Sequence, residues 1–270
     1  MIGASHSRRT PFDRSAGGAD PKIMRSLALI GGPRVAFICG CGHSGTTILA
    51  TILSAHPEIH VPLRESEVFL RRPVNRFRHL LRLRRETSRA GKSYLVEKTP
   101  RHIRKLELIR RLVPDARLVI LVRDGRDVTS SIGRRENGDL AAGFARWVAD
   151  TGIAMDQRGK PDSHIVRYED LVADPGEAIQ ALCGFLGVPY AATMLDYHAQ
   201  PRLWYGQKQI ERGSGVGTGG QHEKLRNWQV NQPIFDGRGR WKAELPPDYV
   251  ARFEQGRARE IMDAFGYALD

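Results

Sequence analysis

The stretch that decides the fold is Gly40-Cys41-Gly42-His43-Ser44-Gly45-Thr46-Thr47, which has the G-x-x-x-x-G spacing of a phosphate-binding loop. Apolar or small residues precede it at 35–39, and an apolar pattern at helical spacing follows it at 48–53. We therefore expect the glycines at a turn from a strand into a helix. There, free backbone N–H groups and the positive end of the helix dipole attract an anion.

The loop lacks the lysine that a nucleoside triphosphate site requires. Thr46 stands where a nucleotidase or kinase has its lysine, and no acidic residue is evident as a ligand for Mg²⁺. The loop therefore predicts one phosphate that carries a different transferable group. The alternative interpretation is an ordinary glycine-rich turn in a Rossmann-like protein.

Strand-like and helix-like patterns alternate after this loop. We expect strands at 93–97, 117–122 and 164–168, with a short extended piece at 59–62. The alternation predicts a three-layer α/β fold, in which helices cover both faces of a central parallel sheet. Ligands of such sheets bind at the carboxyl ends of the strands, so several loops should meet there, namely 40–47, 97–100 and 123–127.

Length and composition bound the organisation of the chain. Its 270 residues fit one domain, which we place at 33–270, after a tail at 1–32 that is rich in Gly, Ser and Arg and is expected to be disordered. No apolar run is long enough for a membrane span. The three cysteines do not form a disulfide framework, which favours a reducing compartment, and we expect a cytoplasmic protein.

The charge of the chain favours anionic ligands. The formal net charge is +12, which attracts nucleotides, nucleic acid, acidic headgroups or acidic glycans. The densest positive segment is Arg71–Lys92, which has nine basic residues and one acidic residue, and its leucines allow a helix with one buried side. The simple interpretation is a solvated helix face, and the alternatives are contact with a polyanionic acceptor or with a membrane surface. We do not expect nucleic acid to be the partner.

Two further segments carry residues suited to holding a nucleotide. Arg123 follows an expected strand, and its guanidinium presents a planar fork of donors that matches a phosphate. Ser131 stands eight residues later, on the opening turns of the next expected helix, where its hydroxyl can complete the site. Tyr168 lies at the end of another expected strand, where tyrosines are also common as core residues with one polar tip.

These pieces, in this order, resemble the sulfotransferases that use 3′-phosphoadenosine 5′-phosphosulfate, and the resemblance covers most of residues 34–265. Residues 43–47 are similar to the 5′-phosphosulfate loop of that family, and the segment from Arg123 to Ser131 is similar to its 3′-phosphate segment. Tyr168 and Gly239-Arg240-Trp241 are similar to its adenine contact and to a terminal loop that closes on the nucleotide. The resemblance implies a P-loop-like topology and a donor that is held without a metal ion. It assigns donor binding to Gly42, His43, Ser44, Gly45, Thr46, Thr47, Arg123, Ser131, Tyr168 and Arg240.

Sulfuryl transfer needs a cation near the leaving oxygen and a base for the acceptor's proton. The resemblance places Lys98 beside the sulfuryl group. The phenol and steroid type of the family uses the histidine of Lys-Thr-His as its base, but Pro100 stands at that position here. The carbohydrate and tyrosylprotein branch instead uses a glutamate shortly after the first helix, where this chain has Glu65 and Glu67. We prefer Glu65, and the chain is closer to that branch.

His43 is a departure from the family, which has Lys or Arg at this position. A neutral imidazole donates one hydrogen bond, and a nearby phosphosulfate that raises its pKa would make it a cation. We therefore include His43 among the catalytic candidates, and His102 is a third choice for the base.

The leading hypothesis is a sulfotransferase that acts on a hydroxyl, or else an amine, of a carbohydrate, lipid or small molecule. One alternative is a P-loop kinase with an atypical loop. The other is a nonenzymatic protein that binds nucleic acid or acidic glycans. The acceptor itself does not follow from the residues, because acceptor pockets are built from variable loops.

Overall fold

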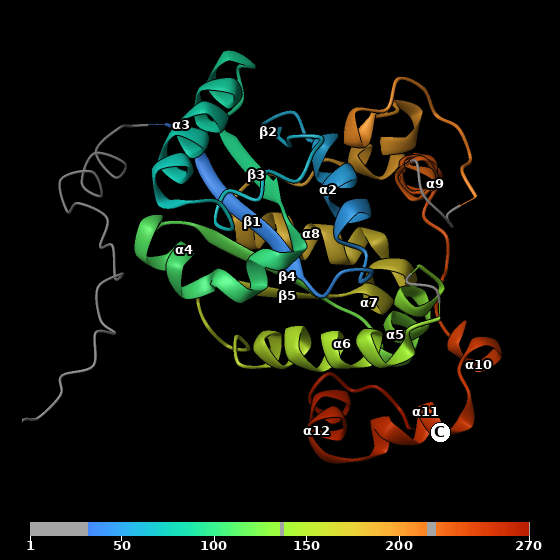
Figure 1. The fold of residues 1–270 in the computed structure, drawn as a ribbon. Coiled ribbons are helices and arrows are strands. Elements are labelled where there is room, and N and C mark those ends of the chain that lie inside the picture. Colours follow the sequence, from blue (N-terminus) through green and yellow to red (C-terminus); the bar gives the residue numbers. More distant parts are fainter. Residues whose placement is uncertain (1–31, 136–137, 215–219, 270) are drawn as a thin grey trace, which may run out of the picture. The chain divides into compact units, whose positions relative to one another are not determined.

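A five-stranded parallel sheet organises the chain in a computed structural model that describes residues 32–135, 138–214 and 220–269 (Figure 1). The strand order is β2-β3-β1-β4-β5, and the central β1 pairs with β3 and β4. The strands are β1 (Arg34–Gly40), β2 (Ile59–His60), β3 (Tyr94–Lys98), β4 (Arg117–Val122) and β5 (Ser163–Arg167). The expected parallel sheet is confirmed. The tail expected at 1–32 lies, up to residue 31, outside the described residues.

Helices cover both faces of the sheet, as the three-layer prediction requires. Figure 1 shows α4 and α6 on one side and α2 and α8 on the other. The α-helices are α2 (Thr46–Ser54), α3 (Pro73–Arg89), α4 (Leu106–Leu112), α5 (Gly125–Arg135), α6 (Leu140–Met155), α7 (Tyr168–Ala173), α8 (Pro175–Leu186), α9 (Gln221–Gln229), α10 (Trp241–Glu244), α11 (Pro247–Val250) and α12 (Gly256–Ala264). The 3-10 segments are η1 (Pro100–Lys105), η2 (Ala192–Ala199), η3 (Trp204–Gly206) and η4 (Ala251–Glu254).

The core lies on both faces of the central strands, which explains their near-continuous apolar sequences. All residues of β4 after Arg117 are buried. On one face, Ile38 packs in a cluster with Leu49 of α2 and Leu182 of α8. On the other face, the Phe37 ring meets the Phe69 ring at a centroid distance of 5.2 Å. The sheet is therefore a rigid platform for the loops at its carboxyl edge.

Besides shifts of one or two residues at the ends of β2, β3 and β5, two predicted boundaries differ from the structure. Tyr168 begins α7 rather than ending β5. The apolar residues from Tyr249 to Phe265 predict one final helix, but this segment is divided into α11, η4 and α12. The division occurs because Gln255 is extended, with φ −133° and ψ 151°, and Gly256 has a positive φ of 51°. Neither departure moves an expected site residue away from the sheet edge.

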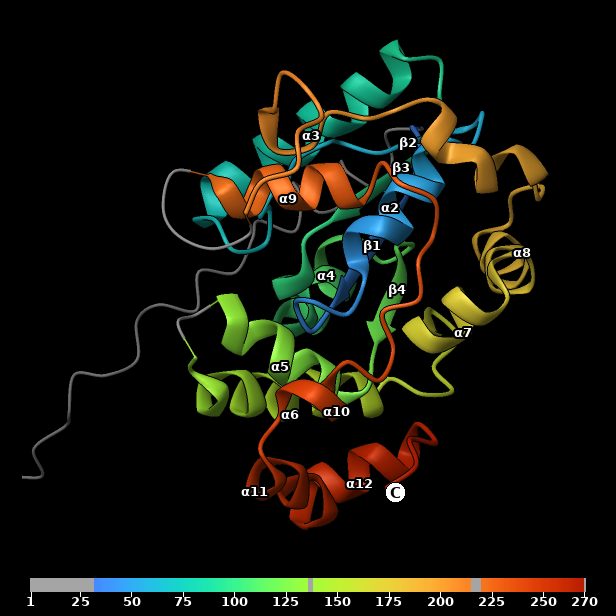
Figure 2. The same ribbon diagram turned by 90° about the vertical axis from the view of Figure 1, so that its right-hand side faces the viewer.

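The basic segment Arg71–Lys92 forms α3 over most of its length. Leu80 and Leu83 are buried, so the helix has the buried side that its leucines predicted. Figure 2 looks toward the edge at which the strands end, where α9 and the segment leading into α10 lie in front of the sheet. That edge holds the candidate site.

Candidate active site

The turn after β1 presents a helix N-terminus without a side-chain cap. Gly45 is the N-cap of α2, with φ 96°, and no side chain accepts a hydrogen bond from the first turn of the helix. A Cβ at Gly45 would lie 2.8 Å from the Tyr168 ring, so only glycine fits both the backbone and the contact. Thr46 and Thr47 are buried on the first turn of α2. These first N–H groups are therefore available to an anion.

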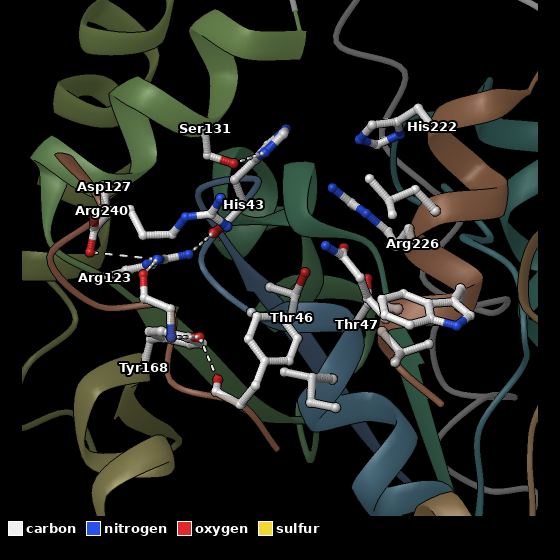
Figure 3. A pocket seen from close by; sticks show the side chains of 18 of the residues that line it. His43, Thr46, Thr47, Arg123, Asp127, Ser131, Tyr168, His222, Arg226 and Arg240 are labelled. Atoms are coloured by element: carbon white, nitrogen blue, oxygen red, sulfur yellow. Dashed lines mark hydrogen bonds and ion pairs between the residues drawn. The ribbon is translucent and has the colours of Figure 1, made fainter. Parts of the chain in front are cut away.

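A pocket of about 610 Å³ lies in front of this turn (Figure 3). One part of its wall is apolar, and the other is strongly basic. The only acidic residue among the described residues that line it is Asp127. The apolar residues are Ile48, Leu171, Val172, Leu225, Trp228, Val230, Ile234 and Phe235, and the arginines are Arg123, Arg134, Arg135, Arg212, Arg226 and Arg240.

Arg123 and Tyr168 form one wall of the pocket. The guanidinium of Arg123 lies over the Tyr168 ring, 4.2 Å from its centroid. It donates hydrogen bonds to the backbone carbonyls of Gly237 at 2.5 Å and of His43 at 3.3 Å, whereas its buried Nε has no partner. The Tyr168 hydroxyl accepts from Gly237 N at 3.2 Å and donates to the Phe235 carbonyl at 3.3 Å. These contacts fix Arg123 before any ligand binds.

A C-terminal strap, residues 235–244, crosses the pocket and is held by Asp127. The carboxylate of Asp127 accepts from Gly239 N at 3.0 Å and from Trp241 N at 3.1 Å. Glu244, at the other end of the strap, pairs with Arg134 at 2.6 Å. Arg240 lines the pocket with a side chain that is half exposed. The acid in the pocket is therefore engaged with the strap's backbone and also lies 3.5 Å from the Arg123 guanidinium, with which it forms an ion pair.

His43 points toward the helix that follows β4 rather than along α2. Its Nδ1 lies 2.8 Å from Ser131 Oγ, and its Nε2 is buried without a partner. Burial lowers the pKa of His43 well below its usual value, and Arg226, Arg135, His222 and Arg146 lower the pKa further. The ring is therefore neutral at pH 7 in the structure. Burial, Arg226 and Arg135 likewise lower the pKa of His222 to about 4.

A second group of polar side chains lies next to the pocket, and we call it the Lys98 cluster: Thr47, Glu65, Lys98 and Tyr205. The Nζ of Lys98 is 2.8 Å from Glu65 Oε1 and 3.3 Å from the Tyr205 hydroxyl. The Tyr205 hydroxyl also lies 3.1 Å from Thr47 Oγ1. The cluster therefore connects the first turn of α2 to an ion pair at the end of β3.

The side chains of the Lys98 cluster have unequal access to solvent. Lys98 is fully buried, with its Nζ 5.2 Å from the centroid of the Trp204 ring, whereas 29% of the Glu65 side chain is exposed. Burial alone would raise the pKa of Tyr205, but Lys98, Arg226 and the hydrogen bond from Thr47 lower it below its usual value. The carboxylate is thus the member of the ion pair that an incoming molecule can reach.

A buried network fixes the backbone that carries Glu65. The Glu97 Oε1 atom accepts from Ser66 N, from Ser66 Oγ and from Thr99 Oγ1, at 3.0, 2.7 and 2.6 Å. Glu97 Oε2 lies 3.0 Å from His102 Nδ1. Burial opposes ionisation of Glu97, but His102 and the two hydroxyls outweigh it and lower the pKa of Glu97. His102 thus belongs to this network, and the next residue after Ser66, Glu67, is exposed.

The other predicted residues lie around the turn. The hydroxyl of Ser44 is buried without a partner. Gly42 lies against Arg146, whose guanidinium a Cβ would meet at 2.6 Å. Eight of the ten predicted donor-binding residues thus line one pocket, and Gly42 and Ser44 do not. Glu65 pairs with Lys98, whereas no hydrogen bond or ion pair joins Glu67 to Lys98 among the described residues.

Sequence reasoning gave no donor-site role to His222 or Arg226. It considered Tyr205 only as a ring that stacks on a sugar or packs. It considered Asp127 only as a possible ion-pair partner of Arg123, and the two do lie 3.5 Å apart. Tyr205 lies in η3 with φ 59°, and the backbone N of its neighbour Trp204 donates to Asn227 Oδ1 at 2.8 Å. No helix or strand pattern marks this segment, so nothing in the residues around it predicted the contact with Lys98. The one available signal for Asp127 was its place in Arg123-Asp124-Gly125-Arg126-Asp127.

Within the described ranges, no group of three or more His, Cys, Asp or Glu side chains could hold a metal ion. No helix in those ranges is both long and apolar enough to cross a lipid bilayer.

Comparison with known proteins identifies the kind of protein that this chain resembles. Residues 77–192 match the model of the sulfotransferase family. The chain is 24% identical to protein-tyrosine sulfotransferase A of Caenorhabditis elegans, over 80% of this chain and 63% of that protein. It is 25% identical to human protein-tyrosine sulfotransferase 1, over 86% of this chain and 70% of that protein. It is 27% identical to nodulation protein NoeE of Sinorhizobium fredii, over 57% of this chain and 50% of that protein. The chain spans less than two thirds of the nematode and rhizobial relatives.

Solved structures share the fold. The sulfotransferase domain from the curacin biosynthetic pathway superimposes with a TM-score of 0.57 and 16% identity, over 88% of this chain and 99% of that domain. A mouse sulfotransferase complexed with PAP superimposes with a TM-score of 0.55 and 14% sequence identity. The match covers 87% of this chain and 89% of that chain. The P-loop-like fold and the resemblance to the sulfotransferases are therefore confirmed, and the tyrosylprotein-type branch fits.

Proposed function

We propose that this chain, a relative of the sulfotransferases, transfers a sulfuryl group from 3′-phosphoadenosine 5′-phosphosulfate to an acceptor hydroxyl. The observation that carries the proposal is the Lys98–Glu65 pair at 2.8 Å, which the Tyr205 hydroxyl joins to Thr47 at the anion-binding turn. A cation and a carboxylate thus lie together where the 5′ end of a bound nucleotide would be. A protein that only binds anions has no need of that pairing.

The pocket fits a nucleotide with a phosphate at each end of its sugar. The uncapped start of α2 offers N–H groups to a 5′-phosphosulfate. Arg123 and Ser131 face the same space and suit a 3′-phosphate, and the apolar wall suits an adenine beside the Tyr168 ring. Unpartnered buried atoms at Ser44 Oγ and Arg123 Nε fit a site that is completed by its ligand.

When bound, the donor supplies an activated sulfuryl group, whose bond to the bridging phosphate oxygen breaks as the acceptor oxygen bonds to sulfur. Glu65 takes the proton of the acceptor hydroxyl, because it is the exposed member of its ion pair. Lys98 then turns its charge toward the bridging oxygen, where negative charge develops. Thr46 and Thr47 orient the group from the first turn of α2, and the strap excludes water.

The acceptor belongs to the proposal only as a class. The names of the relatives point to protein tyrosine, so a tyrosine hydroxyl joins the hydroxyls of carbohydrates, lipids and small molecules as a substrate to test. The basic face of α3 would suit an acidic macromolecule or a membrane surface near the site. A cytoplasmic location and the absence of a metal requirement remain predictions.

The test uses the full chain with sulfur-labelled donor and a panel of tyrosyl peptides, glycans and small alcohols. We expect labelled acceptor and adenosine 3′,5′-bisphosphate to form in equal amounts, with micromolar binding of the bisphosphate by calorimetry. The proposal fails if the bisphosphate does not bind. If Mg²⁺-ATP binds instead, the chain is an atypical kinase, and binding of polyanions without any turnover would indicate a nonenzymatic protein.

A further inference from the structure

We propose that His43 recognises the 3′-phosphate of the donor together with Ser131, and that it thereby makes the pocket select bisphosphorylated over monophosphorylated adenosine nucleotides. The inference rests on the proposed function, because it concerns the same nucleotide. It departs from the expectation that His43 acts on the 5′-phosphosulfate, as a basic residue at this position of the loop would. The residue is assigned to donor specificity rather than to the transfer step.

The backbone of the loop turns His43 toward the 3′ side of the pocket. Its φ of 71° is unusual for a residue other than glycine. The ring reaches Ser131 Oγ at 2.8 Å, and the backbone carbonyl of His43 accepts from Arg123 at 3.3 Å. His43 thus contacts both residues expected to hold a 3′-phosphate (Figure 3).

The His43 ring has one nitrogen without a hydrogen-bond partner. Nε2 is buried and has no hydrogen-bond partner, which is costly in the absence of a ligand. When the Ser131 hydroxyl donates to Nδ1, the proton of the neutral ring lies on Nε2 and can be donated. A phosphate oxygen near Nε2 favours the tautomer with the proton on Nε2, because an unprotonated Nε2 would repel the phosphate oxygen.

The surroundings of His43 are rich in arginine. His222 lies with its ring centroid 6.0 Å from that of His43, and Figure 3 shows His222 and Arg226 on α9, across the pocket from Arg123. Arg135 from α5 and Arg146 from α6 also act on the imidazole electrostatically. Among the described residues that line the pocket, the single carboxylate, Asp127, accepts two backbone hydrogen bonds from the strap. A dianionic phosphate would balance this excess of positive charge.

The experiment compares two nucleotides that differ only in the 3′-phosphate. Adenosine 3′,5′-bisphosphate and adenosine 5′-phosphate are titrated by calorimetry into the wild-type chain, His43→Asn and Ser131→Ala. Asparagine tolerates a positive φ but does not reach the place of Nε2. We expect His43→Asn to weaken the bisphosphate by about tenfold to a hundredfold, as for one hydrogen bond to a charged group, with the monophosphate nearly unchanged.

The controls separate the possible failures. The matched variant His79→Asn changes a histidine of α3 that does not line the pocket, and it should bind both nucleotides as the wild type does. The double variant His43→Asn/Ser131→Ala should lose less than the sum of the single losses, because the two side chains act together. Retained binding of the monophosphate shows that the variant is folded.

Each result decides the inference. If His43→Asn weakens both nucleotides equally, the residue serves the 5′ end, and the inference is overturned. An unchanged bisphosphate affinity overturns it as well. If His43→Asn binds neither nucleotide and its circular dichroism shows unfolding, His43→Gln is compared in the same way. A wild-type chain that binds neither nucleotide would instead refute the proposed function.

Discussion

The pocket and the Lys98 cluster handle charge in opposite ways. In the pocket, six arginines share the wall with one acid, Asp127, which accepts two backbone hydrogen bonds from the strap and lies 3.5 Å from Arg123. In the Lys98 cluster, the cation and the carboxylate neutralise each other at 2.8 Å. The first arrangement suits binding of an anion. In the proposed reaction the second must rearrange before it can act, because Lys98 would have to leave Glu65 for the base to take a proton.

The largest effect is expected at Glu65. Glu65→Gln removes the proposed base, so kcat should fall by about a hundredfold to ten-thousandfold, while binding of the bisphosphate stays near the wild-type value. Steady-state kinetics and calorimetry measure the two quantities. The matched control is Glu67→Gln, which changes an exposed carboxylate two residues away. If Glu67→Gln proves the slower enzyme, the roles of the two glutamates are exchanged.

Lys98→Met tests the other member of the ion pair. Methionine keeps an unbranched apolar stem against Trp204 but has no charge, so kcat should fall by about a hundredfold to a thousandfold, as for the loss of a group that stabilises the developing charge. Single-turnover rates at saturating donor measure the step. We expect the variant to bind the bisphosphate as the wild type does. An affinity that falls as much as kcat would show that Lys98 also binds the nucleotide, which would contradict the separate roles given to the pocket and the Lys98 cluster.

Tyr205→Phe should have a smaller effect. The hydroxyl joins Thr47 to Lys98, and its removal eliminates neutral hydrogen bonds, so kcat should fall by about twofold to tenfold. The ring and its packing remain. Tyr190→Phe, at an exposed tyrosine, is the control. Activity of Tyr205→Phe equal to that of Tyr190→Phe would show that the hydroxyl only fills space.

A chelator should have the smallest effect. Turnover in EDTA should equal turnover in Mg²⁺, because arginines, backbone N–H groups and Lys98 supply the positive charge that a metal gives to kinases. Initial rates in both conditions, after dialysis against the chelator, measure this. Loss of activity in EDTA with recovery on addition of Mg²⁺ would contradict the prediction and favour the kinase alternative.

Much of the fold and of the pocket could be predicted because regular patterns mark them. Parallel strands end at one edge, so Lys98 and Arg123 were expected to meet the glycine turn, and the structure has Lys98 as the last residue of β3 and Arg123 just after β4. The choice between Glu65 and Glu67 depends on a loop whose register is set by Glu97, a tertiary contact across 31 residues to Ser66. Tyr205 reaches Lys98 from 107 residues away and has no local pattern at all.

The orientation of His43 shows another limit of sequence reasoning. The motif fixes where the residue stands, but the φ of 71° decides which end of the pocket its ring meets. Tyr168 is a second example, because its hydroxyl forms hydrogen bonds with Phe235 and Gly237 of the strap and not with β5, the strand that precedes it. Contacts made by distant segments set such details.

The buried carboxylate of Glu97 has a consequence for how this protein can diversify. It accepts hydrogen bonds from Ser66 and Thr99, the neighbours of Glu65 and Lys98 in the sequence. These bonds, rather than contacts with α3, set the spacing between Glu65 and Lys98. Mutations on the outer face of that helix can then accumulate without disturbing the chemistry. If α3 contacts the acceptor, as proposed above, replacing its arginines should change the acceptor preference and leave the reaction itself unchanged.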